Sequence, residues 1–208
     1  MKFSTQKLVA ALVLTASLGA CAPVMLGGAV MGTLMATDRR TAGTQVEDEG
    51  IELRGASRIR EKLGERGHVN LTSYNRQVLL TGEVPSAQDK QLVEQVMSTV
   101  ENVRSIVNEL GVMENSSLSQ RSSDTLVTGK IKATLVDAQD LFANAFKVVT
   151  ERGTVYLMGR VTQREANRAT DMVRTIDGVK KVVRVMEIIS EEELQRVQPK
   201  AAPAEVKK

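Results

Sequence analysis

The sequence predicts an α+β protein made of two similar domains, because one strand pattern occurs twice along the chain. Valine or leucine alternates with other residues over residues 155–161, and the same alternation runs over residues 78–84. Each stretch carries a glycine two positions before its last valine, Gly159 in one and Gly82 in the other. A period of two is the pattern of a β-strand with one buried face. The repetition indicates an internal duplication, and we call its halves the first copy and the second copy.

A shorter strand and a tight turn precede each of these strands. In the second copy the shorter strand covers residues 146–148 and the turn residues 151–154, where Gly153 can adopt a positive φ angle. In the first copy the corresponding strand covers residues 69–71 and the turn residues 74–76. We expect each pair of strands to form a β-hairpin.

A helix is predicted after each glycine-containing strand. Thr162 and Glu165 have the spacing of a capping box, and Ser86 and Asp89 form a weaker version of one. Apolar residues then recur at helical spacing in both copies, which predicts helices that bury one stripe. They are Ala166, Ala169, Met172, Val173 and Ile176 in the second copy and Leu92, Val93, Val96, Met97 and Val100 in the first.

The end of each of these helices is predicted at a residue pair that tolerates left-handed backbone, residues 177–178 and residues 101–102. β-branched runs follow at once, over residues 182–189 and 103–112, and indicate a third strand reached by a crossover. A further helical pattern lies upstream of each hairpin. It consists of Ile59 and Leu63 in the first copy and of Val127, Ile131 and Leu135 in the second.

This order of elements, α-β-β-α-β with a glycine-centred strand, resembles the BON domain family. The resemblance covers roughly residues 46–190 and implies a three-stranded mixed sheet packed on two helices in each copy. We assign the first BON domain to residues 46–113 and the second to residues 123–190. Residues 114–122 between them are rich in serine and lack apolar periodicity, which predicts a linker. Residues 191–208 are expected to begin as a helical stub and to continue as a disordered tail.

Residues 1–20 have the pattern of a signal peptide. Lys2 and Lys7 precede an apolar run over residues 8–18, which is too short to span a bilayer. The single cysteine, Cys21, follows at once, and Leu18-Gly-Ala-Cys21 resembles the lipobox of bacterial lipoproteins. The resemblance implies cleavage before Cys21 and lipid attachment to it, and Ala22 after it implies sorting to the outer membrane. A free or buried cysteine behind an ordinary signal peptide is the alternative.

Residues 21–45 are predicted to be a flexible tether. The segment over residues 22–36 is apolar but rich in glycine, and it is shorter than the roughly 20 residues that a membrane span requires. Gly28 and Gly32 have the small-residue spacing of a helix-dimer motif, which is an alternative interpretation of this segment.

Composition argues against nucleic-acid binding and against catalysis. Aromatic residues make up 2% of the chain, tryptophan is absent, and the formal net charge of +3 falls to +1 when the two lysines of residues 1–20 are removed. His68 is the sole histidine and is expected to be a satisfied surface residue at a strand start. No His/Cys/Asp cluster has metal-ligand spacing, and Gly82 and Gly159 are interpreted as strand positions where a helix packs close. We therefore expect no catalytic residues, no metal and no cofactor.

The two copies differ most in the outward face of their first helix. At 100° per residue, Val127, Ile131, Leu135 and Ala138 point toward the sheet. The opposite face carries an apolar stripe flanked by cations: Leu126, Gly129, Ala133 and Val136, with Lys130 and Lys132 at its edges. Such a face suits a bilayer with anionic headgroups. The corresponding face of the first copy carries Arg54, Ser57, Glu61 and Gly64 and is expected to be solvated.

The residues alone leave alternatives open. Leu126 and Val136 either contact a membrane, pack on the first domain, the linker or the insertion over residues 137–144, or are simply exposed. Leu141 and Phe142 in that insertion either cap the core or form a second contact patch. Resemblance to outer-membrane lipoproteins with two BON domains implies phospholipid binding through the first helix of the second domain. An aromatic residue would suit a membrane wedge better than Leu126 does.

We therefore expect a lipid-anchored protein on the periplasmic face of the outer membrane. Its second domain would bind anionic phospholipid and support envelope integrity, including cell division and the stress response. The alternative is an adaptor whose same face binds an outer-membrane assembly, division or cell-wall remodelling protein. An unrecognised hydrolase, the third hypothesis, would depend on His68.

Overall fold

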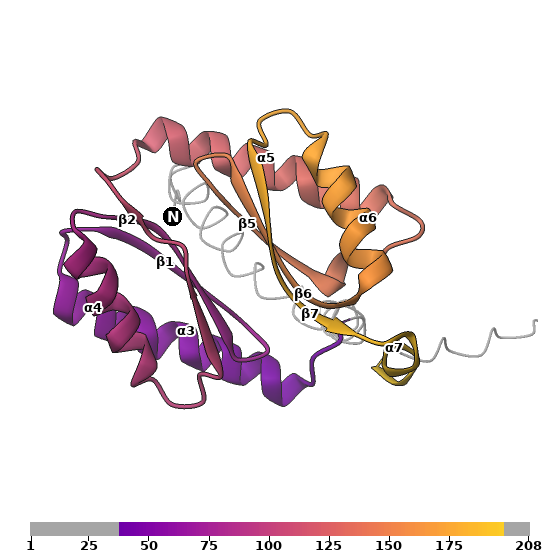
Figure 1. Ribbon diagram of the computed structural model, residues 1–208, viewed down its shortest axis with the longest axis horizontal. Coiled ribbons are helices and arrows are strands. Elements are labelled where there is room, and N and C mark those ends of the chain that lie inside the picture. The colour runs from indigo at the N-terminus through magenta and orange to yellow at the C-terminus, as the bar shows by residue number, and fades with distance from the viewer. Residues whose placement is uncertain (1–37, 198–208) are drawn as a thin grey trace, which may run out of the picture. The chain divides into compact units, whose positions relative to one another are not determined.

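The computed structural model describes residues 38–197, and it contains the same series of elements twice (Figure 1). The first copy consists of α3 (Ala42–Leu63), β1 (His68–Tyr74), β2 (Gln77–Val84), α4 (Ala87–Ser98), β3 (Ser105–Asn108) and β4 (Gly111–Val112). The second copy consists of α5 (Leu118–Asp137), the 3-10 turn η2 (Ala143–Ala145), β5 (Phe146–Glu151), β6 (Thr154–Thr162), α6 (Gln163–Arg174) and β7 (Lys181–Ile189). A last helix, α7, covers Glu191–Val197. The predicted α+β class is confirmed.

Both sheets are mixed, as the order of elements predicted. β1 pairs with β2 in antiparallel fashion and β3 pairs with β2 in parallel, while β5, β6 and β7 repeat this arrangement in the second copy. The third strand of the first copy is interrupted after Asn108, and its second piece, β4, again pairs in parallel with β2. The first sheet therefore differs from the second by this break.

Local signals in the sequence placed the turns and caps correctly. Both hairpin turns have two consecutive residues with positive φ, Asn75 and Arg76 in one and Arg152 and Gly153 in the other, as in type I′ turns. The Thr162 side chain accepts a hydrogen bond from the Glu165 backbone N–H in a complete capping box. The Ser86 side chain accepts the corresponding bond from the Asp89 backbone N–H at the start of α4. Gly178 and Asn102 adopt the positive φ expected after the second helix of each copy.

The interpretation of Gly82 and Gly159 as sites of close helix packing was wrong. A Cβ atom on Gly82 would lie 2.0 Å from the backbone oxygen of His68, at the start of β1. A Cβ atom on Gly159 would lie 2.3 Å from the backbone oxygen of Ala145, immediately before β5. Glycine is required because the backbone of the partner strand approaches, and the two copies share this constraint.

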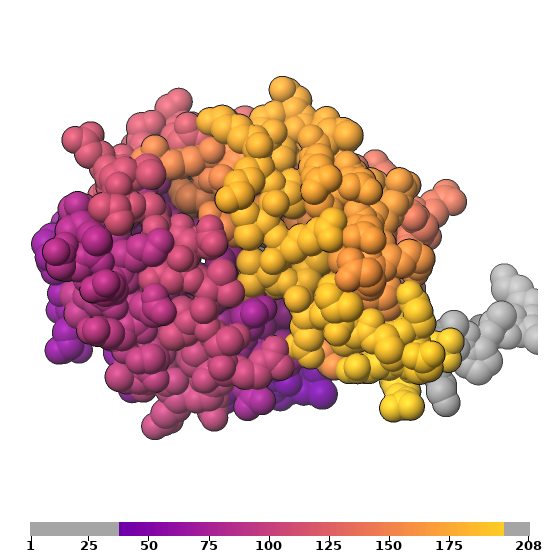
Figure 2. Space-filling model, in the orientation of Figure 1, coloured from indigo at the N-terminus to yellow at the C-terminus, as the bar shows by residue number. Residues whose placement is uncertain are grey.

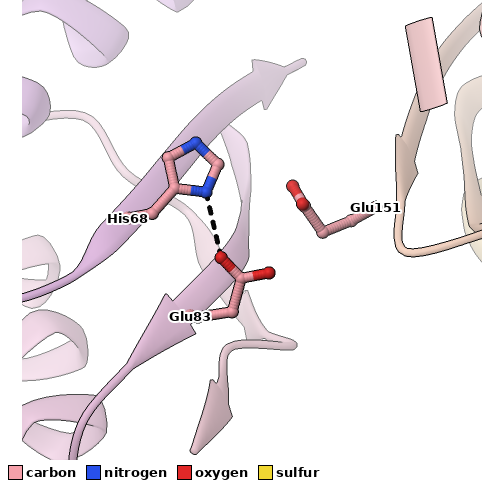
Figure 3. A group of neighbouring side chains, drawn as sticks. All are labelled: His68, Glu83 and Glu151. Atoms are coloured by element: carbon pink, nitrogen blue, oxygen red, sulfur yellow. Dashed lines mark hydrogen bonds and ion pairs between the residues drawn. The ribbon is translucent and has the colours of Figure 1, made fainter. Parts of the chain in front are cut away.

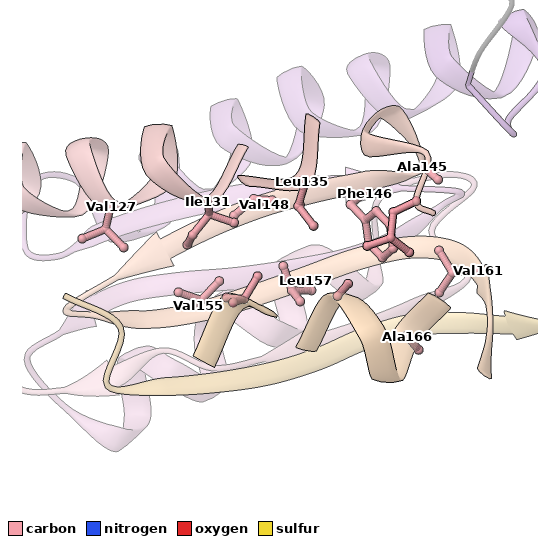
Figure 4. Close-up of a cluster of buried hydrophobic side chains, with 13 residues drawn as sticks. Val127, Ile131, Leu135, Ala145, Phe146, Val148, Val155, Leu157, Val161 and Ala166 are labelled. Atoms are coloured by element: carbon pink, nitrogen blue, oxygen red, sulfur yellow. The ribbon is translucent and has the colours of Figure 1, made fainter. Parts of the chain in front are cut away.

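Each copy has its own core between its helices and one face of its sheet. In the second copy Val127, Ile131 and Leu135 of α5 pack on Val155 and Leu157 of β6 (Figure 4). In the first copy Ile51, Ile59 and Leu63 pack on Val78 and Leu80, the corresponding residues of β2. The face that sequence periodicity assigned to the interior is therefore the helix-facing side of each sheet.

A third core lies between the two sheets, which pack against each other with the helices on their outer sides (Figure 1). Its centre contains Tyr74 and Leu79 from the first copy and Tyr156, Met158 and Val185 from the second. In the space-filling view the atoms of the two copies meet along a continuous boundary (Figure 2). β2 and β6 are thus buried on both faces, whereas the alternating pattern had predicted one buried face.

Several boundaries differ from those expected from the sequence. α5 begins at Leu118 because Ser117 accepts a hydrogen bond from the Gln120 backbone N–H, so the predicted linker over residues 114–122 is shorter by its second half. α3 begins at Ala42, capped by Thr41, inside the predicted tether over residues 21–45. The predicted signal peptide, Cys21 and the rest of the tether to residue 37, and the tail from residue 198, lie outside the described residues.

The segment before α3 joins the two copies through a buried ion pair. The Arg39 guanidinium donates two hydrogen bonds to the Glu165 carboxylate, at 2.7 and 2.8 Å, and a third to the Arg160 backbone oxygen. Both side chains of the pair are only 2% exposed. Burial alone would raise the pKa of Glu165, but Arg39 and the Thr162 backbone N–H outweigh burial and hold the pKa below its usual value.

Replacing Arg39 by alanine should lower the free energy of unfolding by about 3 kcal/mol, because the Glu165 carboxylate would be left buried without its cation. Urea denaturation of the purified protein measures this change. Arg168→Ala is the matched control, since its pair with Asp140 is about half exposed and contributes at most about 1 kcal/mol. Equal effects of the two substitutions would contradict the buried position of Arg39.

The two tyrosines of the chain, Tyr74 and Tyr156, both lie in the core between the sheets, and burial raises the pKa of each phenol to about 12. Titration followed at about 295 nm should therefore show no tyrosine ionisation near pH 10, the value for an unfolded chain. Because the phenols ionise at a lower pH in the unfolded chain than in the folded protein, ionisation favours unfolding. The contribution of the two neutral tyrosines to stability is therefore fully present below about pH 10 and is lost as the pH rises further. Ionisation near pH 10 in the folded protein would show that the sheets separate in solution.

Candidate functional site

Helix α5 presents two faces of opposite character. Val127, Ile131 and Leu135 are buried against the sheet, as the helical spacing predicted. Leu126 and Val136, on the other side, are each 69% exposed, and Gly129 and Ala133 between them are also exposed. The outward apolar stripe predicted from the sequence is therefore present on the surface.

Leu118 extends this stripe toward the start of the helix, which the sequence analysis missed. It is 80% exposed, and at 100° per residue it lies within about 20° of Gly129 and Val136. The spacing was readable in the sequence, but Leu118 had been assigned to the serine-rich linker. We call Leu118, Leu126, Gly129, Ala133 and Val136 the α5 stripe.

Lys130 and Lys132 border the α5 stripe on its two sides, and both are exposed. The Lys130 ammonium lies 3.6 Å from a carboxylate oxygen of Asp177, whose side chain is almost fully exposed, so this ion pair is weak. Among the described residues Lys132 has no ion pair. Both cations are therefore available to an anion that approaches the stripe.

Two of the alternatives left open by the sequence concern the insertion before β5. Leu141 is buried and belongs to the core of the second copy, so it acts as a cap on that core. Phe142 remains about half exposed, with the Arg39 guanidinium 5.9 Å from its ring centre. The exposure of Leu126 and Val136 excludes their packing on the insertion, the linker or the first copy within residues 38–197.

The outward face of the corresponding helix in the first copy is largely exposed to solvent, as expected, but it also carries apolar side chains. Ser57, Glu61 and Gly64 are exposed as predicted, and Arg54 is partly buried in a pair with Glu47. Leu53, however, is 75% exposed, and Val46 two turns earlier is exposed as well. Leu53 lies at the margin of a surface pocket of about 650 Å³ between α3 and β1. The cations beside Leu53 are arginines rather than lysines: Arg54 is paired with Glu47, and Arg60 lines the same pocket.

His68 is the first residue of β1, as predicted, but it is mostly buried rather than at the surface. Its Nδ1 lies 3.1 Å from Oε2 of Glu83, and its side chain is 19% exposed. Glu83 also accepts hydrogen bonds from Arg152 and from the backbone N–H of Ser116. Burial alone would raise the pKa of Glu83, but these donors outweigh burial and hold the pKa below its usual value.

Glu151, from the second copy, lies beside this pair. Burial raises the pKa of its carboxyl group; the hydrogen bond from the Asn70 amide opposes that shift, and the negative charges of Glu83 and Asp124 add to it. Sequence spacing gave no sign of a metal-binding cluster, yet His68, Glu83 and Glu151 bring possible ligand atoms within 4.8 Å of one another.

No helix within residues 38–197 is long and apolar enough to cross a membrane.

Gly129 offers a test of how open the outward face of α5 is. A Cβ atom at this position would have no neighbour within 4 Å, so Gly129→Ala should raise the free energy of unfolding by about 0.5–1 kcal/mol through helix propensity alone. Gly55→Ala is the control, because its Cβ would lie 2.6 Å from Leu71 and 2.7 Å from Met97 and should destabilise the protein by about 1–3 kcal/mol. Thermal or urea unfolding measures both; destabilisation by Gly129→Ala would mean that something covers this face.

Comparison with known proteins identifies the duplicated unit. The family model of the BON domain matches residues 54–114 and 123–190. The chain is 36% identical over 186 residues to "Outer membrane lipoprotein DolP" of Haemophilus influenzae, an alignment that covers 88% of this chain and 96% of that protein. It is 34% identical over 154 residues to "21 kDa hemolysin" of Actinobacillus pleuropneumoniae, covering 73% and 79%.

Among solved structures, CdsD, a structural protein of the type III secretion system of Chlamydia trachomatis, covers 68% of this chain at 14% identity. The match spans 96% of that chain with a TM-score of 0.30, which is too low to carry an argument. The two family matches coincide with the two copies of the fold. The chain belongs to the BON-domain family and contains the domain twice.

Proposed function

We propose that this protein is a lipid-anchored outer-membrane protein that binds anionic phospholipid through the outward face of α5. The observation that carries the proposal is the exposed α5 stripe with Lys130 and Lys132 at its edges. A contiguous apolar patch that stays exposed on a folded protein often marks a site that binds another protein or a membrane. Cations beside it favour a surface of negatively charged headgroups over a neutral one.

The anchor is proposed from the sequence and from the relatives. Leu18-Gly-Ala-Cys21 resembles a lipobox, and the Haemophilus influenzae relative is named an outer membrane lipoprotein. Acylation of Cys21 would hold the protein at the periplasmic face of the outer membrane, because each buried CH₂ of an acyl chain contributes about 0.8 kcal/mol.

The α5 stripe by itself would bind only weakly. Full burial of a leucine or valine side chain contributes about 1.5–3 kcal/mol, and a lysine near an anionic surface contributes about 1 kcal/mol. Ordering the helix against the membrane opposes this gain. A tethered domain, however, meets the membrane at a high effective concentration, so a weak contact suffices to select its position.

In this two-part attachment the acyl chains keep the protein on the membrane, and α5 determines where on the membrane it stays. Enrichment at sites rich in anionic phospholipid, such as the division site, would connect the protein with envelope integrity and the response to envelope stress. This role requires binding without chemistry, so we propose no catalytic residue.

The fragment that starts at Thr37 lacks Cys21, so its co-sedimentation with vesicles tests the α5 stripe alone. We expect it to bind vesicles that contain anionic phospholipid, and Leu126→Glu to weaken this binding by about tenfold, as expected for the loss of one buried leucine. Leu53→Glu is the matched control, since Leu53 is an equally exposed leucine on the corresponding helix of the first copy. If Leu126→Glu and Leu53→Glu weakened vesicle binding equally, the membrane contact could not be assigned to α5.

Charge reversal separates the electrostatic contribution from the apolar one. Lys130→Glu combined with Lys132→Glu should abolish the preference for anionic over neutral vesicles, and binding of the unchanged protein should fall as salt is added. Arg60→Glu combined with Lys62→Glu, on the exposed last turn of α3, is the control because it makes the same change in net charge. A preference that persists in the double variant contradicts the role of the two lysines.

The alternative function is that of an adaptor, in which the α5 stripe binds an outer-membrane assembly, division or cell-wall remodelling protein. A photocrosslinker placed at position 126 or 136 distinguishes the two functions in cells. Adducts with phospholipid support the proposal, whereas discrete protein adducts, together with no vesicle binding by the fragment, support the adaptor.

A further inference from the structure

Three side chains capable of binding a metal ion converge where the two copies meet. His68 at the start of β1 and Glu83 near the end of β2 belong to the first copy, and Glu151 at the end of β5 belongs to the second. The three side chains point toward a common space, with the Glu151 carboxylate facing the imidazole and the Glu83 carboxylate (Figure 3). Positions so distant in the sequence are brought together only by the packing of the two sheets.

The geometry is close to that of a three-ligand site. All three potential ligand atoms lie within 4.8 Å of one another, and the Nδ1 of His68 is 3.1 Å from Oε2 of Glu83. Zn²⁺ binds imidazole nitrogen and carboxylate oxygen at about 2.0–2.2 Å, so ligand atoms around one ion lie about 3.4 Å apart in tetrahedral geometry. A side-chain movement of at most about 1.4 Å, the difference between 4.8 and 3.4 Å, would bring the ligand atoms to that spacing.

The local charge also favours a cation. Oε1 of Glu83 forms an ion pair with Arg152 at 2.6 Å, and Oε2 faces His68. Oε2 also accepts hydrogen bonds from the backbone N–H and the hydroxyl of Ser116, which an ion at this oxygen would have to share or displace. The Glu151 carboxylate is buried, and the hydrogen bond that it accepts comes from the neutral Asn70 amide at 2.9 Å. Asp124 lines the same pocket as His68 and Glu151 and adds a further negative charge nearby. Its carboxylate accepts hydrogen bonds from the backbone N–H groups of Arg152 and Gly153 in the β5–β6 turn.

Solvent can reach the cluster. A pocket of about 240 Å³ opens beside it, lined by His68 and Glu151 on one side and by the start of α5 on the other. Arg121 also lines this pocket, but its Nε donates to the Ser116 hydroxyl. An ion therefore has a route to the ligands, and the pocket leaves room for a water molecule as fourth ligand.

We propose that His68, Glu83 and Glu151 form a binding site for a divalent transition-metal ion such as Zn²⁺. One imidazole nitrogen and two carboxylate oxygens are ligand types that suit Zn²⁺ and its first-row neighbours, and they are less suited to Ca²⁺ or Mg²⁺. Because two ligands come from the first copy and one from the second, the ion would cross-link the BON domains. Binding to the folded state alone stabilises that state in proportion to RT ln(1 + [Zn²⁺]/Kd).

The sole histidine of the chain makes the test direct. In the intact protein purified in detergent, with ring ¹⁵N-labelled histidine, addition of Zn²⁺ should shift the resonance of one imidazole nitrogen, with saturation at one ion per chain. Co²⁺ used as a second probe should give visible absorption bands of a four-coordinate site. A histidine spectrum unchanged at excess Zn²⁺ overturns the proposal without any variant.

Variants then identify the carboxylates. His68→Ala and Glu151→Gln should each weaken Zn²⁺ binding in calorimetry by at least about tenfold, as expected when a ligand is removed, and should abolish the Zn²⁺-dependent rise in Tm. Asp140→Asn, which alters an exposed carboxylate elsewhere in the second copy, should bind as the unchanged protein does. Circular dichroism without metal checks that each variant is folded.

The vesicle experiments do not depend on this outcome, because Leu126 and the lysines of α5 are not ligands. Zn²⁺ binding that survives both His68→Ala and Glu151→Gln would assign the ion to carboxylates elsewhere on the surface and would overturn the site.

Discussion

The contact between the two sheets is the constraint on which the rest of this structure depends. Leu79 and Met158 have no exposed surface, and Tyr74, Tyr156 and Val185 close the same core around them. An apolar centre of this kind is surrounded by polar pairs, among them Lys147 with Glu52 and Arg104 with Glu187, which is the usual arrangement of a stable protein interface. Because the inner faces of both sheets are used in this contact, the helices must lie on the outside. The outward face of α5 is therefore free for another partner.

The segment before α3 adds a second connection between the copies. Arg39 binds Glu165, the residue that completes the capping box of α6, so one buried carboxylate both caps a helix and pairs with a cation from the segment before α3. Next to it, the Arg40 guanidinium lies 4.3 Å from the ring centre of Tyr74 and pairs with Asp48. A buried charge is tolerated only when its partners are in place, so these contacts specify where the chain joins the first domain. Arg39 and Arg40 thus hold the residues before α3 against both BON domains.

Duplication has given two copies with one scaffold and different surfaces. Both keep the glycine that allows close approach of the hairpin strands, both keep the type I′ turn, and both bury the same helix positions. On the outward side α3 exposes Leu53 beside a pocket, whereas α5 exposes a longer apolar stripe with a lysine on each side. Residues that hold the scaffold cannot vary without loss of stability, but outward residues can, so a new binding property arises most easily there.

The sequence by itself determined the elements and their order, because caps, turns and periodicity act between residues that are close along the chain. The capping box at Thr162, the left-handed Gly178 and the inward face of α5 were all predicted in this way. The helical spacing of Leu118 also predicts its place on the α5 stripe, but the serines around it led to its assignment to the linker. The burial of the second face of β2 and β6, the pairing of Arg39 with Glu165, and the meeting of His68 with Glu151 depended on tertiary structure. Each of these contacts joins residues that are far apart in the sequence. A local sequence pattern does not indicate which face of a sheet another sheet will cover.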